Sequence, residues 1–159
     1  MAFTRPMDEV LVVLTVLRRL GSDSISKLDD RIRSQKIQYV AQLFGVSPRY
    51  GYNLYLHGPY SPELARDLFT YSENPLKLDL RPFGANQLES RFRNLRSFVE
   101  ARNTRQLELI CTYHWLLSIV GLTGDAAKTR LKELKQASIE EINLTIAMTR
   151  EMENAIKAC

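Results

Sequence analysis

Apolar residues recur every three or four positions along most of the chain, the spacing that gathers them on one face of an α-helix. This pattern predicts a first helix over 5–20, ended by Gly21, and a stronger one over 31–44, ended by Gly45. Further helices are predicted over 61–71, 87–101, 104–120 and 123–136, with a weak short helix at 25–30 and a last helix that begins after Ser138. Residues 104–120 are apolar nearly all round, so we expect that helix to be the buried centre of the C-terminal half.

One stretch alternates with a period of two instead. Aromatic and branched residues fill every second position over 50–56, which predicts a short strand. Gly58-Pro59 follows, and we expect the strand to end there because proline lacks an N–H and glycine permits a sharp corner. Ser61 then fits the N-cap of a helix, with Pro62 at its first position and Glu63 near the positive end of its dipole.

The order helix, short helix, helix, strand and turn is that of a winged helix-turn-helix, in which the third helix would contact DNA. We therefore expect a mainly α (α+β) fold. A winged-helix-like part with a short β element would cover 1–80 and pack on a helical bundle over 81–159, the two forming one compact unit. Leucines alternate at 76, 78 and 80, so this segment could add an edge strand, although the prolines on both sides of it lie very close.

Length and composition narrow the class of protein. The chain has 159 residues, of which 45% are hydrophobic, enough for a core. The two cysteines, Cys111 in an apolar run and Cys159 at the end, do not suggest a disulfide framework and favour a reducing compartment. The first residues lack the pattern of a signal peptide, and the apolar run 109–122 is too short to span a bilayer. We expect a cytoplasmic protein that does not contact a membrane.

The net charge of +4 is unevenly spread. Segment 81–105 contains six arginines, among them Arg91, Arg93 and Arg96, and only two glutamates. An excess of this size permits contact with nucleic acid without requiring it. A solvated, arginine-rich helix face explains the same composition.

A polar row on the predicted helix 31–44 is the strongest signal for nucleic-acid binding. Glutamines and an arginine recur opposite the apolar stripe, and these side chains can hydrogen-bond adenine, guanine or phosphate in a major groove. An ordinary surface helix shows the same pattern. The candidate nucleic-acid-binding residues are Arg31, Arg33, Gln35, Lys36 and Gln38, with Arg91, Arg93 and Arg96 on phosphates.

Residues able to carry catalysis or bind a metal are few. His57 and His114 are the only histidines, and Cys111 precedes His114 by three residues. A metal needs three or four converging ligands and a nucleophile needs a base in reach, so this pair is better explained as a core cysteine beside a hydrogen-bonded histidine. No glycine-rich phosphate loop is present. We expect no enzymatic activity, no cofactor and no metal.

Tyrosines gather around the Gly-Pro corner. Tyrosine is enriched in protein interfaces, and it can also stack on bases. The candidate partner-binding residues are Tyr52, Tyr55, His57 and Tyr60.

Three segments resemble the YwgA-like prokaryotic proteins and, more distantly, the Panacea domain of SocA-like antitoxins. They are R-S-Q-K-I-Q-Y at 33–39, Y-N-L-Y at 52–55 and H-G-P-Y-S-P-E-L at 57–64. The helical segments 107–119 and 131–134 are also similar to the tail of the YwgA-like group. The resemblance implies a mostly helical, winged-helix-like fold without a cofactor, and, from the Panacea relatives, a protein that works by contacting another protein.

Our leading prediction is a non-enzymatic interaction module, antitoxin-like or regulatory, that binds a protein partner through 52–64. The alternative is a DNA-binding winged-helix transcriptional regulator. The two differ in salt dependence, because only neutralised phosphates make affinity fall steeply with salt. A homodimer through either half is left open.

Overall fold

The computed structural model describes residues 2–159, and in that range the chain is mainly helical, with one two-stranded antiparallel sheet. This confirms the mainly helical prediction with a short β element. The elements are α1 (Met7–Arg19), α2 (Leu28–Leu43), β1 (Asn53–Tyr55), β2 (Gly58–Tyr60), α3 (Pro62–Glu73), α4 (Asn86–Glu100), α5 (Thr104–Ser118), α6 (Gly124–Lys135) and α7 (Ile139–Lys157).

Capping residues begin the helices where the sequence placed them. The Ser61 hydroxyl accepts a hydrogen bond of 3.2 Å from the Leu64 N–H at the start of α3, with Pro62 as the first helical residue. Ser138 opens α7 with both hydrogen bonds of a capping box. Each cap satisfies N–H groups that have no partner inside the helix, which is why these short polar residues mark helix starts so reliably.

The predicted single strand over 50–56 is wrong. Strand β1 is shorter, and Gly58, expected to end it, begins β2 after a turn at Leu56 and His57, so the two strands form a hairpin. The chain can reverse here because Gly58 has a φ of +90°, which a residue with a Cβ rarely adopts. The expected short helix at 25–30 is also wrong, since α2 already begins at Leu28. The edge strand left open at 76–80 does not form.

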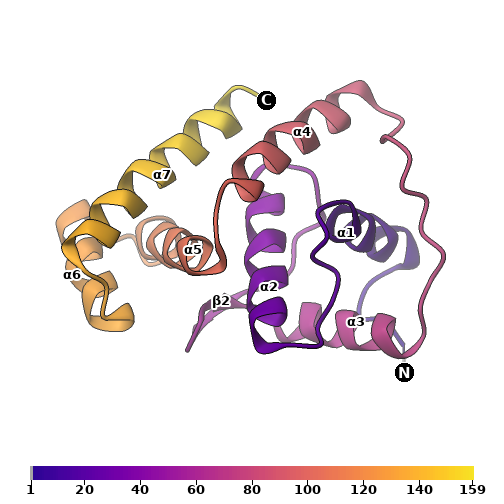
Figure 1. The fold of residues 1–159 in the computed structure, drawn as a ribbon, viewed down its shortest axis with the longest axis horizontal. Coiled ribbons are helices and arrows are strands. Elements are labelled where there is room, and N and C mark those ends of the chain that lie inside the picture. Colours follow the sequence, from indigo (N-terminus) through magenta and orange to yellow (C-terminus); the bar gives the residue numbers. More distant parts are fainter. Residues whose placement is uncertain (1) are drawn as a thin grey trace.

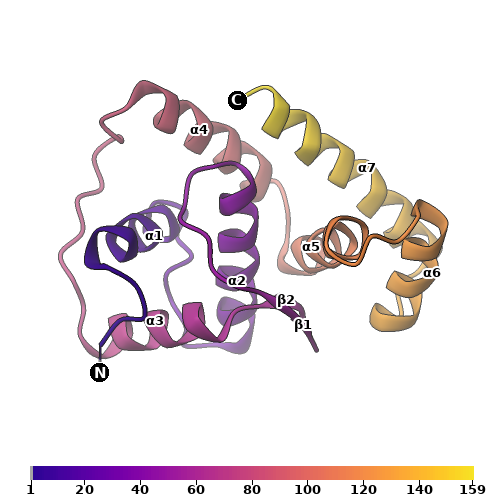
Figure 2. The same cartoon turned by 180° about the vertical axis from the view of Figure 1, so that it is seen from behind.

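Helix α5 packs against both α6 and α7, as expected of the central helix of the C-terminal half, and it also packs against α2 of the N-terminal half. Figure 1 shows it between α2 on one side and α6 and α7 on the other, and it also contacts β2. Seen from behind in Figure 2, the hairpin projects past α2 on the side where α6 lies. No helix within residues 2–159 is long and apolar enough to cross a membrane.

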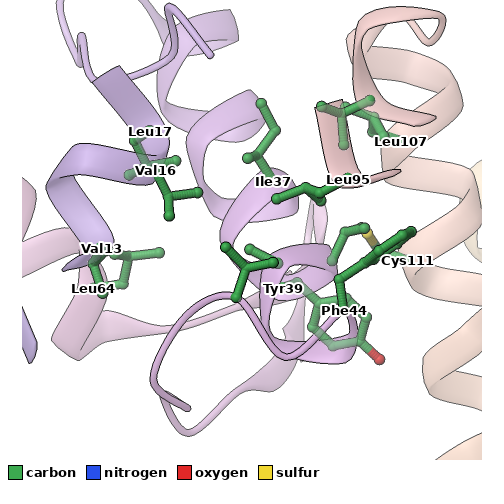
Figure 3. Packing of buried hydrophobic residues seen from close by; sticks show 14 of the residues in the cluster. Val13, Val16, Leu17, Ile37, Tyr39, Phe44, Leu64, Leu95, Leu107 and Cys111 are labelled. Carbon is green, nitrogen blue, oxygen red and sulfur yellow. The ribbon is translucent and has the colours of Figure 1, made fainter. Parts of the chain in front are cut away.

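A continuous hydrophobic cluster draws on both ends of the chain. It includes side chains from α1, α2, α3, α4, α5 and α7, and Figure 3 shows Val16, Ile37, Leu95 and Leu107 converging in it. A second cluster joins α5, α6 and α7 around Leu131. Because α2 packs against α1, α3, α4, α5 and β2, most of its surface is covered by other elements.

Candidate functional site

A buried lysine of α2 holds the β-hairpin formed by β1 and β2. Lys36, on α2, is only 1% exposed, and its Nζ donates a hydrogen bond of 2.9 Å to the carbonyl oxygen of Pro59. Burial lowers the pKa of Lys36 to about 8, because removal from water disfavours the charged form. A lysine is thus placed in the interior at an energetic cost in order to fix the backbone of β2.

A second lysine fixes the turn of the hairpin. Lys135 Nζ, at the end of α6, lies 2.7 Å from the carbonyl oxygen of Leu56 and 3.0 Å from Glu108 Oε1 on α5. The Lys135 and Glu108 side chains are 5% and 10% exposed. His57 Nδ1 lies 3.5 Å from the same Glu108 oxygen. Helices α2, α5 and α6 therefore each contribute one charged side chain to the support of the hairpin.

The polar row of α2 is not a surface, and its prediction as one is wrong. Gln35 and Gln38 are 3% and 0% exposed. Gln35 bonds both backbone groups of Ser61, accepting from its N–H at 2.9 Å and donating to its carbonyl oxygen at 3.0 Å. Gln38 donates to the carbonyl oxygen of Pro48, and Gln42 accepts from the Tyr50 N–H.

These contacts have one physical cause. The segment after α2 lies largely outside regular structure, so its buried N–H and C=O groups need partners, and long polar side chains from α2 supply them. Three of the candidate nucleic-acid-binding residues, Gln35, Lys36 and Gln38, are therefore already bonded inside the protein and cannot reach a base in this conformation.

The candidate arginines lie in different surroundings. Arg33 is half-buried and donates to the carbonyl oxygens of Val99 and Arg102, and its burial lowers the pKa of the guanidinium. Arg96 lies over the Phe92 ring, 4.9 Å from its centroid, and Arg91 lies against Gly45 at the end of α2. Arg31 and Arg93 are the exposed members of the set. Nucleic-acid contact through these arginines stays a prediction.

The tip of the hairpin is apolar and open to solvent. Leu56 is 83% exposed and Tyr55 51%, values high for large apolar side chains. Tyr55 meets Tyr60 edge to face with their centroids 5.3 Å apart, so the candidates Tyr55, His57 and Tyr60 do lie together. Tyr52 does not join them, because its half-buried side chain packs edge to face against Tyr39, and burial raises the pKa of its hydroxyl well above the usual range.

Two hollows flank this tip. One, of about 200 Å³ and almost entirely apolar, lies between the hairpin and α2 and is lined by Ile32, Gln35, Lys36, Tyr55, Leu56, His57 and Tyr60. The other, of about 310 Å³, lies between β1 and the end of α6 and is lined by Leu54, Tyr55, Leu56, Leu134 and Lys135. A protruding leucine with a hollow on each side suits the contours of a protein partner.

Cys111 lies in the core as the sequence indicated, and His114 is hydrogen-bonded as expected but only half-buried. The thiol of Cys111 is fully buried against the carbonyl of Lys36, and burial raises its pKa to about 12. His114 Nδ1 lies 2.6 Å from the Tyr39 hydroxyl, and burial lowers the pKa of the imidazole. Within residues 2–159, no three side chains of the metal-binding types converge.

Sequence reasoning missed Glu108 and Lys135. A signal existed for Glu108, a lone carboxylate in an otherwise apolar helix, because a charge in that position needs a buried partner. Lys135 had none, since it lies in a helix rich in exposed lysines.

No protein-family model matches the chain, and no curated protein or solved structure matches it. The resemblance to the YwgA-like and Panacea groups therefore stays a prediction.

Proposed function

We propose that this protein is a non-enzymatic protein-binding module that docks a partner on its β-hairpin. The partner surface would comprise Tyr55, Leu56, His57 and Tyr60 with the two flanking hollows. An antitoxin-like or regulatory role in the cytoplasm, which the sequence resemblance and the cysteine content imply, is the setting we propose for it. The hairpin would serve as the wing of a winged-helix-like N-terminal part.

The observation that carries the proposal is the exposed Leu56 on a hairpin fixed by buried charges. Burying a leucine side chain against a partner contributes about 1.5–3 kcal/mol. A tip that is already held in place loses little conformational entropy on binding. More of the free energy gained by burying the leucine therefore contributes to affinity. Two lysines removed from water to hold the Pro59 and Leu56 carbonyls provide this rigidity.

The proposal is tested with a photo-crosslinking amino acid at position 56 and, as a matched control, at Phe69 on α3, which is 47% exposed. Each full-length variant is added to native extract, irradiated and recovered through steps of increasing salt. We expect one protein to crosslink at position 56 and not at 69 and to survive high salt. Excess unlabelled wild type should abolish this crosslink, whereas excess Leu56→Asp should not.

A different outcome would favour the DNA-binding alternative. Nucleic acid released at moderate salt, with a log–log slope of about −0.9 per phosphate contact and reduced by Arg93→Ala, would replace the protein-binding proposal. Equal crosslinking at positions 56 and 69 would also reject the protein-binding proposal. A tip that binds its partner specifically must crosslink to it better than an unrelated exposed aromatic residue does.

A further inference from the structure

Strand β1 has a free edge. Its register pairs Asn53 with Tyr60, Leu54 with Pro59, and Tyr55 with Gly58. In an antiparallel pair, residues that exchange backbone hydrogen bonds alternate with residues that do not. Pro59 has no N–H, so Leu54 and Pro59 form a pair that does not exchange backbone hydrogen bonds. The N–H and C=O of Leu54 therefore point away from β2. Within residues 2–159, no third strand covers that edge.

The hollow of about 310 Å³ runs along this free edge. Its lining comes from β1 and the turn on one side and from Leu134 and Lys135 of α6 on the other, with no residue of β2. The hollow therefore borders β1 and not β2. A strand edge facing a helix across an apolar hollow is an arrangement that accepts an extended peptide, whose backbone pairs with the strand while a side chain fills the hollow.

Two exposed lysines lie on α6, on the same side of the helix as Lys135. Lys128 and Lys132 precede Lys135 by seven and three residues and so share its face of α6. Both are exposed and neither forms an ion pair within the described part of the chain, whereas Arg130 is paired with Glu133 at 3.2 Å. Lys135 is itself neutralised by Glu108. Two unpaired positive charges thus lie on the face of α6 that Lys135 shares.

We propose that β1 binds an extended, acidic segment of the partner protein as a third strand, in the groove between β1 and α6. The segment's backbone bonds the Leu54 N–H and C=O, one apolar side chain fills the hollow, and its carboxylates lie near Lys128 and Lys132. This inference rests on the proposed protein-binding function and names the chemistry of the partner.

The probe is a peptide selected from a phage-displayed library of random peptides on the full-length protein, with affinity measured by fluorescence anisotropy. We expect the selected peptides to be acidic around an apolar residue. N-methylation is then scanned along the best peptide. Strand addition predicts that one methyl group, on the peptide N–H that donates to the Leu54 carbonyl oxygen, weakens binding by about tenfold, the loss of one backbone hydrogen bond, and that the others are tolerated.

Variants of the protein separate backbone from side-chain effects. Leu54→Pro removes only the outward N–H and the side-chain shape, and an edge strand tolerates proline. Leu54→Ala keeps the N–H and serves as its control. We expect Leu54→Pro to weaken the peptide about tenfold more than Leu54→Ala does. The pair Lys128→Glu and Lys132→Glu should also weaken it, and more so at low salt, while Lys157→Glu at the far end of α7 should not.

Several outcomes overturn the inference. A uniform N-methyl scan, or equal affinities of Leu54→Pro and Leu54→Ala, means that the groove does not bind an extended backbone. A library that enriches no peptide sensitive to Leu54→Pro has the same meaning. Sedimentation compares the oligomeric states: if the wild type is a dimer and Leu54→Pro is a monomer, the edge of β1 binds a second copy of the chain and not a partner peptide. In each case a salt-resistant crosslink at position 56 leaves the protein-binding function standing, which keeps the two proposals separable.

Discussion

Lys135 Nζ and Glu108 Oε1 lie 3.0 Å apart in the interior, and the same ammonium holds the carbonyl oxygen of Leu56 at 2.7 Å. The ion pair thus connects α5, α6 and the hairpin through a single nitrogen. A buried pair of this kind contributes little net stability, because desolvation offsets most of the attraction, but loss of one member leaves an uncompensated charge. Its value for this protein is the fixed position of the turn.

The first prediction concerns that ion pair. Lys135→Met should reduce the free energy of unfolding by about 3–5 kcal/mol, because the Glu108 carboxylate stays buried without its closest partner. Adding Glu108→Leu should restore part of the loss, so the double variant should be more stable than Lys135→Met alone. Urea unfolding followed by circular dichroism measures both.

The exposed pair Arg130 and Glu133, 54% and 59% exposed, is the control for this experiment. Arg130→Met should change stability by no more than about 0.5 kcal/mol. Strictly additive losses in the Lys135 and Glu108 double variant would contradict the coupling.

The second prediction concerns the corner of the hairpin. A Cβ on Gly58 would lie 2.7 Å from the buried Thr112 Oγ1 and 3.2 Å from Lys36 Cε, at a φ of +90°. Gly58→Ala should therefore destabilise the fold by about 2–5 kcal/mol through backbone strain and overpacking together. Gly51→Ala is the matched control, since nothing lies within 4 Å of its Cβ position and its φ is not left-handed. Similar losses in both variants would show that the close approach at Gly58 is not the cause.

The third prediction distinguishes a structural from a base-reading glutamine. Gln35→Ala leaves the buried N–H of Ser61 without a partner, while the Ser61 C=O keeps its hydrogen bond from the Ala65 N–H, and this should lower the free energy of unfolding by about 1–3 kcal/mol. Gln87→Ala, at an exposed position in α4, should change it by less than about 0.5 kcal/mol. A Gln35→Ala variant that keeps its stability but loses affinity for DNA would reverse this assignment.

The helices could be predicted from the sequence because their signals are local. A cap such as Ser61 or Ser138 acts within four residues, and an apolar stripe needs only helical spacing to be recognised. The central position of α5 also followed from a local property, since a helix that is apolar nearly all round has to be surrounded.

The site could not be predicted in the same way because its residues act across the chain. Gln35 and Lys36 bond backbone groups more than twenty residues away, and Lys135 reaches one that precedes it by seventy-nine. A polar row opposite an apolar stripe normally faces water, and only the packing of other elements on both sides of α2 turns it inward. The hairpin was missed for a related reason: Gly58-Pro59 ends a strand in isolation, but here it begins one because α2 and α5 support it.

The last prediction concerns pH. His114 packs against the Tyr39 hydroxyl and lies 3.2 Å from Ser118 Oγ, and burial lowers the pKa of its imidazole, with Glu153 of α7 opposing that shift. The unfolded chain therefore binds a proton more readily than the folded protein does. The free energy of unfolding should be highest above the ordinary histidine pKa of 6.5 and fall as the pH drops below it, towards the lowered pKa of the folded state.

Urea unfolding between about pH 7.5 and 5.5 measures this dependence. Glu89 does not affect this pH window. The Arg19 guanidinium lowers the pKa of Glu89 to about 2, so the contribution of Glu89 to the free energy of unfolding is lost only at more acidic pH. His114→Asn keeps a hydrogen-bonding group near Tyr39 and should flatten the profile. A profile that keeps its slope in His114→Asn would show that the imidazole beside Tyr39 is not the source of the pH dependence.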